Sequence, residues 1–250
     1  MQQSSMRRIQ LTVAYDGTDY HGWQFQPGKA TIEGELNGCL SALLGEGVKV
    51  IGASRTDAGV HGLCNIAVFD TKSRIPGDKF SHALNGRLPK DIRIRHSKEV
   101  ELTFHPRKVA SRKTYEYRIS TEEFENPLER RYSYHTYYPL NVGDMQRAAQ
   151  YLVGEHDFAS FCAAGSTAET TVRTIYQLEV LRENSLICIR VTGNGFLYNM
   201  VRIIVGTLAE IGRGRRAPEE METILAAADR SKAGPTAPSC GLILMNYEFT

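Results

Sequence analysis

The sequence has few of the features that mark metal, disulfide-bonded or membrane proteins. Its five cysteines form no C-x-x-C pair and leave one unpaired in any disulfide scheme, so a reducing cytoplasm is the simplest location. The seven histidines show no H-x-x-x-H spacing, and we expect no metal ion. The longest apolar run, residues 196–211, is interrupted by Arg202 and is too short to span a bilayer. Because the N-terminus also lacks the apolar core of a signal peptide, we expect a soluble protein without membrane contact.

The sequence also has little excess of charge of one sign, since 30 Lys and Arg residues stand against 28 Asp and Glu residues. The net charge is only +2, so a polyanionic partner would have to bind local clusters of basic residues. One such cluster lies between Arg87 and Arg118, where ten Lys or Arg residues stand against four acids. Arg213, Arg215 and Arg216 form a second group. A solvated basic surface and a nucleic-acid surface both fit this pattern.

Hydrophobic periodicity predicts a β-α-β-β-α-β order in the first half of the chain. Apolar residues alternate over residues 9–15, which predicts a strand. Thr31 can cap a helix with an apolar stripe at Ile32, Leu36, Cys39, Leu40 and Leu43, and Gly45 and Gly47 can end it. The remaining elements are strands over residues 48–51 and 66–69, a short helix over 78–84 and a strand around 92–94.

The second half repeats this order less regularly. Its predicted elements are strands over 113–119, 176–181, 186–191 and 242–249, and helices over 145–152, 195–211 and 218–227. We therefore predict an α+β protein with two tandem ferredoxin-like halves in one mainly antiparallel sheet and helices on one face. The expected parts are a flexible lead at residues 1–6, a first half at 7–105 and a second half at 106–250. The sheet face opposite the helices would be free to hold a ligand.

The most informative segment is the loop at residues 52–62, GASRTDAGVHG, in which Arg55 and Asp57 stand two positions apart among small residues. Small residues let a ligand or another backbone come close. An Asp in such a loop is often only an Asx turn or a cap for backbone N–H groups. A phosphate-binding P-loop does not fit, because the G-x-x-x-x-G-K-[ST] spacing is absent.

Arg202 is the second informative residue, because nearly all its neighbours in residues 200–205 are apolar. A buried guanidinium needs an anion, and Asp57 is the best candidate in the sequence. Gly206 lies on the same helical face and would let another segment approach. Pairing would favour the ionised carboxylate, which suits a nucleophile. A snorkelling arginine on the helix surface is the alternative.

The predicted strand at 113–119 places Tyr115 and Tyr117 on one face and Glu116 and Arg118 on the other. A tyrosine on a sheet can stack on a nucleobase, but core packing is the commoner role, and we favour it for Tyr117. Basic residues at 104–108 and 112–113 would add positive charge beside such a stacking surface.

Four strings occur in order along the chain: SRTDAGVHG, RKTYEYRIS, LVGEHDFASF and GNGFLYNMVRIIVGTLAEIGRG. With them the chain resembles the bacterial tRNA pseudouridine synthase A (TruA) family from about Ile9 to the C-terminus. The resemblance implies the pseudouridine synthase fold and the isomerisation of uridine to pseudouridine at nucleotides 38, 39 and 40, in the anticodon stem-loop of tRNA. It also implies a cytoplasmic homodimer that binds tRNA and needs no cofactor or metal.

Residue by residue, Asp57 resembles the catalytic aspartate of the family, and Tyr115 resembles the tyrosine that stacks against the target uracil. Arg55 resembles the arginine that displaces the target base, and Arg202 the arginine that pairs with the aspartate.

The sequence departs from the family pattern at two places. Ser54 stands where Gly is frequent, and Cys64 and Asn65 stand where a Gln-Val pair is common. None of the three replaces a reacting group.

The implied reaction requires the target nucleotide to leave the RNA stem, at a cost of roughly a few kcal/mol. Asp57 would then attack either the ribose C1′ or the uracil C6, and Tyr115 is the candidate for removing the C5 proton, directly or through water. Two other functions fit parts of the sequence. A non-catalytic RNA-binding module would leave Asp57 without a role. An Asp-nucleophile N-glycoside hydrolase normally needs a second carboxylate, which the motif lacks.

Overall fold

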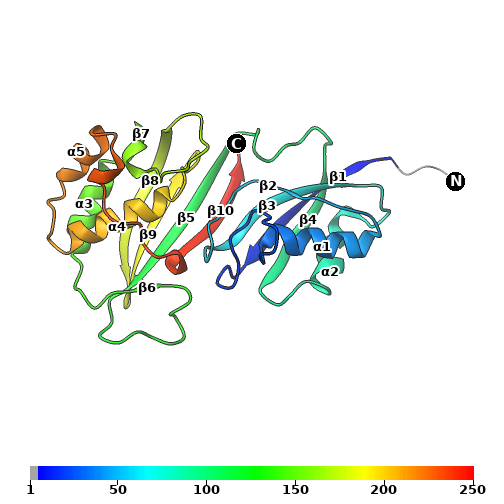
Figure 1. Cartoon of the computed structure of the whole chain (residues 1–250), viewed down its shortest axis with the longest axis horizontal. Coiled ribbons are helices and arrows are strands. Elements are labelled where there is room, and N and C mark those ends of the chain that lie inside the picture. The colour runs from blue at the N-terminus through cyan, green and yellow to red at the C-terminus, as the bar shows by residue number, and fades with distance from the viewer. Residues whose placement is uncertain (1–4) are drawn as a thin grey trace. The chain divides into compact units, whose positions relative to one another are not determined.

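A computed structural model describes residues 5–250, with ten strands and five α-helices among them (Figure 1). The chain divides into two compact units, one running to Ala110 and including Leu244–Thr250, the other formed by Ser111–Ile243. Most of the predicted flexible lead, residues 1–4, lies outside the described residues, and the halves at 7–105 and 106–250 stay predictions. The α+β class is confirmed.

The first unit has the predicted β-α-β-β-α-β order. Its elements are β1 (Arg7–Tyr15), α1 (Ile32–Leu44), β2 (Ile51–Gly52), β3 (His61–Thr71), α2 (Phe80–Asn85) and β4 (Ile92–Val100), with a 3₁₀ turn at Gly77–Lys79 before α2. Strand β1 pairs antiparallel with β3 on one side and β4 on the other, β2 pairs with β3, and β10 (Leu242–Phe249) is the next strand beyond β3.

The core of the first unit lies between this sheet and its two helices. Ile9, Leu11 and Val13 of β1 pack in one cluster with the apolar stripe of α1 and with Phe80 and Leu84 of α2, so both helices cover one sheet face (Figure 1). The expected ends of α1 are confirmed, since the Thr31 hydroxyl accepts the Gly34 N–H and Gly45 adopts φ 70°.

The second unit contains β5 (Ser111–Ser120), β6 (Tyr134–His135), β7 (Gly154–Asp157), β8 (Val172–Glu183) and β9 (Leu186–Gly193), with α3 (Val142–Gln150), α4 (Met200–Gly212) and α5 (Glu220–Ala226). The strand order is β5-β9-β8-β7 with antiparallel pairing throughout, and β6 pairs in parallel with β5.

Several predicted boundaries were wrong, and three of them bear on the motifs singled out in the sequence. The helix expected over 195–211 begins only at Met200, because Asn199 adopts a left-handed φ of 59° that no helix can continue through. Strand β3 starts at His61, five residues early, so the second part of the 52–62 motif belongs to a strand. Of the strand expected over 48–51, only Ile51 pairs, together with Gly52.

Among the described residues, no helix combines the length and apolar character that crossing a membrane requires.

Candidate active site

The loop at residues 52–62 buries every second side chain around its centre. Ser54 and Thr56 are buried, whereas Arg55 is exposed and Asp57 is partly exposed. This alternation lets the small hydroxyl side chains anchor the loop while the two charged groups reach solvent. Arg55 and Asp57 are therefore available to a ligand, as a catalytic role requires.

Asn65 of β3 holds the 52–62 loop in place through its backbone. This fully buried residue of β3 accepts the Ser54 N–H at 3.3 Å through Oδ1 and donates from Nδ2 to the Ser54 carbonyl at 3.0 Å. Nδ2 also lies 3.5 Å from the Tyr15 hydroxyl. Both backbone groups of Ser54 are thus held by one side chain, directly before Arg55. Sequence reasoning noted Asn65 only as a departure from a family pattern and did not give it this role.

Thr56 is held on two sides. Its Oγ1 lies 2.9 Å from the Tyr15 hydroxyl, and its carbonyl accepts the Trp23 N–H at 3.0 Å. Burial raises the pKa of Tyr15 to about 12, so the phenol stays protonated at neutral pH and keeps its hydrogen bonds. The backbone directly before Asp57 is consequently rigid, which suits a group that must meet a reacting atom at a fixed position.

The segment between β1 and α1 packs closely against the same loop. A Cβ on Gly22 would come within 2.5 Å of the Thr56 carbonyl oxygen, and Gly22 adopts φ 85°. His61 is buried at the start of β3, where its Nδ1 lies 3.1 Å from the Gly17 nitrogen and from Asp16 Oδ1. These contacts indicate a supporting role for His61.

Arg202 in the second unit lies on α4, where it is partly buried among apolar neighbours. Its Nε donates to the Ala237 carbonyl at 2.8 Å, and its Nη1 donates to Asn199 Oδ1 at 2.9 Å. The expectation that Gly206 admits another segment is confirmed, because a Cβ there would collide with the Pro235 carbonyl oxygen. The guanidinium is therefore held in a fixed position, and its pairing with Asp57 stays a prediction.

Tyr115 and Tyr117 share one face of β5, as predicted, and both are buried. Tyr117 is a core residue, with no exposed surface and its hydroxyl bound to the Pro238 carbonyl at 2.7 Å. Tyr115 is 7% exposed and its ring meets that of Phe196 edge to face, with the centroids 5.2 Å apart. Stacking of Tyr115 on a uracil stays a prediction.

The other face of β5 carries an ion cluster. Glu116 is 2% exposed and accepts hydrogen bonds from Arg118 Nε at 2.7 Å and Arg190 Nε at 2.6 Å. Burial alone would raise the pKa of Glu116, but the two guanidinium groups more than offset it, and the net pKa is lowered. This arrangement joins β5 to β9 and is structural.

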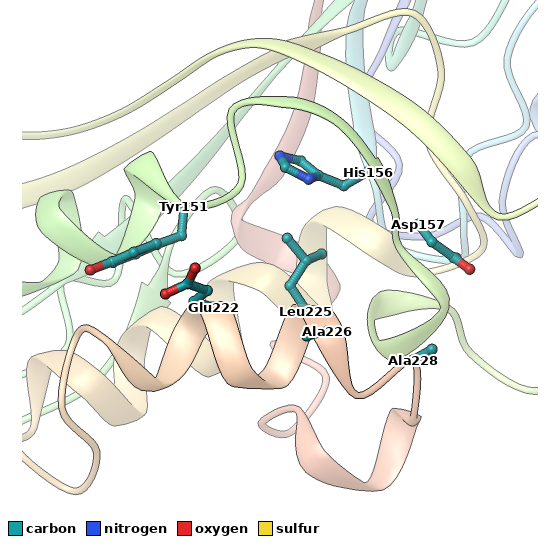
Figure 2. A pocket seen from close by; sticks show the side chains of 7 residues that line it. All are labelled: Tyr151, His156, Asp157, Glu222, Leu225, Ala226 and Ala228. Atoms are coloured by element: carbon teal, nitrogen blue, oxygen red, sulfur yellow. The ribbon is translucent and has the colours of Figure 1, made fainter.

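A cavity of about 420 Å³ lies in the second unit, beside α5 and β7 (Figure 2). Figure 2 shows Glu222 and Leu225 projecting from α5 on the side where Tyr151 and His156 lie. Asp157 also lines the cavity, and none of its seven lining residues is a Lys or Arg. An acidic hollow without a cation repels phosphate, so this cavity does not suit a nucleic acid. In residues 5–250, no group of three or more His, Cys, Asp or Glu side chains could hold a metal ion.

Comparisons with known proteins agree with the motif. Residues 11–107 and 148–250 match the family described as "tRNA pseudouridine synthase". A "tRNA pseudouridine synthase A" of Ruminiclostridium cellulolyticum is 51% identical over 245 residues, which cover 98% of this chain and all of that protein. A protein of the same name from Thermoanaerobacter sp. (strain X514) is 48% identical over 244 residues, with 98% and 100% coverage.

Among solved structures, the "Crystal structure of the archaeal box H/ACA sRNP Nop10-Cbf5 complex" matches with a TM-score of 0.35 and 12% identity, over 81% of this chain and 44% of that one. This likeness is too distant to bear on function. The match to the family and the identity to full-length relatives confirm the predicted resemblance and the pseudouridine synthase fold that it implies. The chain belongs to the tRNA pseudouridine synthase family.

Proposed function

We propose that this chain isomerises uridine to pseudouridine in tRNA, with Asp57 as the nucleophile. The observation that carries the proposal is the 52–62 loop itself, which holds its backbone through Ser54 and Thr56 and leaves Asp57 and Arg55 accessible. The family and the names of the full-length relatives support the same reaction.

The reaction exchanges one bond for another within a single nucleotide. The bond from N1 of uracil to C1′ of ribose breaks, a bond from C5 to C1′ forms, C5 loses a proton, and N1 gains one. Because atoms and electrons balance without an external oxidant or reductant, the chemistry requires no redox cofactor. Asp57 attacks either C1′ of the ribose or C6 of the uracil, and in both cases its carboxylate leaves at the end.

Three further residues have proposed roles. Arg55, exposed beside Asp57, fills the space that the target base leaves when the nucleotide turns out of the stem. Arg202 pairs with Asp57 and keeps it ionised. Tyr115 contacts the turned-out uracil and is the candidate for removing the C5 proton, directly or through water.

The finer features of substrate and assembly rest on the resemblance. We propose that the target uridines lie at nucleotides 38, 39 and 40, in the anticodon stem-loop, and that two copies of the chain form a cytoplasmic homodimer on one tRNA. Light scattering checks the dimer, since it should give twice the chain mass of 27.9 kDa; a monomeric mass at working concentration would contradict it.

The experiment that tests the reaction is nucleoside analysis of unmodified tRNA after incubation with the protein. Pseudouridine that replaces uridine without release of free uracil is the expected result. Free uracil would instead support the N-glycoside hydrolase, and unchanged RNA bound with normal affinity would support the RNA-binding module.

A further inference from the structure

The segment at residues 104–108 is fixed against the rest of the first unit by three contacts. The Phe104 ring meets Phe249 edge to face with centroids 5.1 Å apart, and the Phe104 carbonyl accepts a hydrogen bond from Arg8 Nη1 at 2.7 Å. The Pro106 carbonyl accepts the Tyr247 hydroxyl at 3.1 Å. The backbone directly before Arg107 is therefore rigid.

Arg107 reaches from this segment to the first residue of the 52–62 loop. Its Nε donates to the Gly52 carbonyl at 2.7 Å, which sets the direction of the guanidinium, although the side chain remains exposed. Arg55 stands three residues after Gly52 and is also exposed. Within the described part of the chain, Arg55 has no hydrogen bond or ion pair, so its charge is not neutralised there.

The positive charge of Arg55 disfavours the protonated form of Arg107 when no anion is present. The pKa of Arg107 is lowered, first by the partial burial of its side chain and then by the charge of Arg55, while Glu33 and Tyr247 act in the opposite direction. An anion between the groups would relieve this repulsion. Guanidinium donors match a phosphate geometrically, because they can offer two parallel N–H groups to its oxygens.

We propose that Arg107 binds a phosphate group of the RNA backbone at the opening of the 52–62 loop, where the nearby charge of Arg55 adds to the attraction. Arg107, with its Nε anchored to Gly52, presents its terminal nitrogens to the phosphate oxygens, while Arg55 enters the space left by the turned-out base. The contact places the strand beside Asp57 without reading its sequence. The inference rests on the proposed function, since it identifies how that site holds its substrate.

The test compares Arg107→Gln with Lys108→Gln in the full-length protein. The glutamine amide can still donate to the Gly52 carbonyl, so Arg107→Gln removes the charge but keeps this hydrogen bond. Lys108, the adjacent exposed cation, provides the control. The tRNA dissociation constant is measured over a range of KCl concentrations, with kcat and KM for pseudouridine formation measured alongside. Inorganic phosphate, added at constant ionic strength, serves as a competitor.

For Arg107→Gln we expect tRNA binding to weaken about tenfold, the slope of log Kd against log salt to fall by about 1, and kcat to change less than about threefold. Lys108→Gln should leave the slope nearly unchanged. An unchanged affinity and slope in Arg107→Gln would overturn the proposal. A loss of kcat alone would also overturn it, because Arg107 would then only support the 52–62 loop through its hydrogen bond to Gly52. Competition between inorganic phosphate and tRNA that Arg107→Gln abolishes would agree with the proposal, whereas phosphate binding at Arg107 that does not displace tRNA would overturn the RNA assignment in favour of a free-phosphate site. A wild-type protein that binds tRNA with this salt response but forms no pseudouridine would instead refute the proposed function.

Discussion

At the scale of single residues, the accessible groups of the site depend on buried ones. Asp57 and Arg55 reach solvent because Asn65, Tyr15 and Thr56 beneath them form a hydrogen-bonded network. A buried amide that satisfies both backbone groups of Ser54 leaves two unsatisfied partners when it is removed, which is more costly than losing a surface hydrogen bond. Asn65 therefore contributes both to the position of the 52–62 loop and to the stability of the protein.

We predict that Asn65→Ala lowers the free energy of unfolding by about 2–3 kcal/mol and lowers kcat at least tenfold. Asn85→Ala is the matched control, because Asn85 also holds one backbone N–H and one carbonyl, both of Ile94, away from the loop. Urea unfolding and steady-state kinetics of both variants check this. If Asn85→Ala lowers kcat as much as Asn65→Ala at equal stability loss, Asn65 has no positioning role.

The sequence could predict Arg55 and Asp57 because their motif is local and unusual in charge. It could not predict the role of Asn65 or Arg107. Both act through long-range contacts, from β3 to Ser54 and from residue 107 to Gly52, and no periodicity shows which buried or basic side chain will face a loop many residues away. The pairing of Asp57 with Arg202 depends on the same kind of information.

At the scale of secondary-structure elements, β5 and β9 are joined by charge as well as by their backbone ladder. Glu116 lies opposite Arg190 in the register, and its net pKa is lowered from its ordinary value of 4.5 by Arg190 and Arg118 in spite of burial. A lowered pKa means that the stabilisation is present above the ordinary value and is lost as the pH falls through the folded-state value.

We predict that Glu116→Gln lowers the free energy of unfolding at pH 7 by about 1–3 kcal/mol, and that the difference from wild type shrinks as the pH falls below about 4. Glu183→Gln is the control, because Glu183 binds Arg190 at the surface and should contribute little. Denaturant unfolding between about pH 3 and about pH 7 measures the free energy of unfolding of wild type and both variants. A difference that stays constant with pH would show that the Glu116 charge does not stabilise the fold.

Helix α4 depends on a glycine for its packing. A Cβ at Gly206 would collide with the backbone at Pro235, two residues before the Ala237 carbonyl that accepts from Arg202, whereas Gly38 in α1 has open space around it. We predict that Gly206→Ala destabilises the protein by about 3 kcal/mol and Gly38→Ala stabilises it by about 0.5–1 kcal/mol. Thermal unfolding of the two variants shows whether each substitution lowers or raises stability. A neutral Gly206→Ala would mean that the 233–237 segment is free to move away from α4.

Element boundaries show where local patterns stop being informative. The apolar residues before Met200 continue the period of α4, but Asn199 turns the chain into the left-handed region and leaves Phe196 to pack on Tyr115. Strand β7, with the sequence GEHD, has no apolar alternation and forms only because β8 offers it an edge. By contrast, α1 carries its own cap, stripe and left-handed glycine, and it was predicted almost to the residue.

At the scale of the whole molecule, a net charge of +2 leaves RNA binding to local groups such as Arg55 and Arg107. An acidic side chain beside these cations weakens the attraction for a polyanion, so Asp57 is unfavourable for binding and must be explained by chemistry. Loss of its charge should therefore leave tRNA affinity equal or higher while it abolishes turnover.

The most direct test of Asp57 as the nucleophile is tritium release from tRNA labelled at C5 of uridine. Wild type and Asp57→Asn are compared at matched RNA occupancy. Formation of the C5–C1′ bond expels the C5 hydrogen, so we predict release by the wild type and none above background by Asp57→Asn. Equal release by the two proteins would contradict Asp57 as the nucleophile, and no release by the wild type from unmodified tRNA would contradict the isomerase function itself.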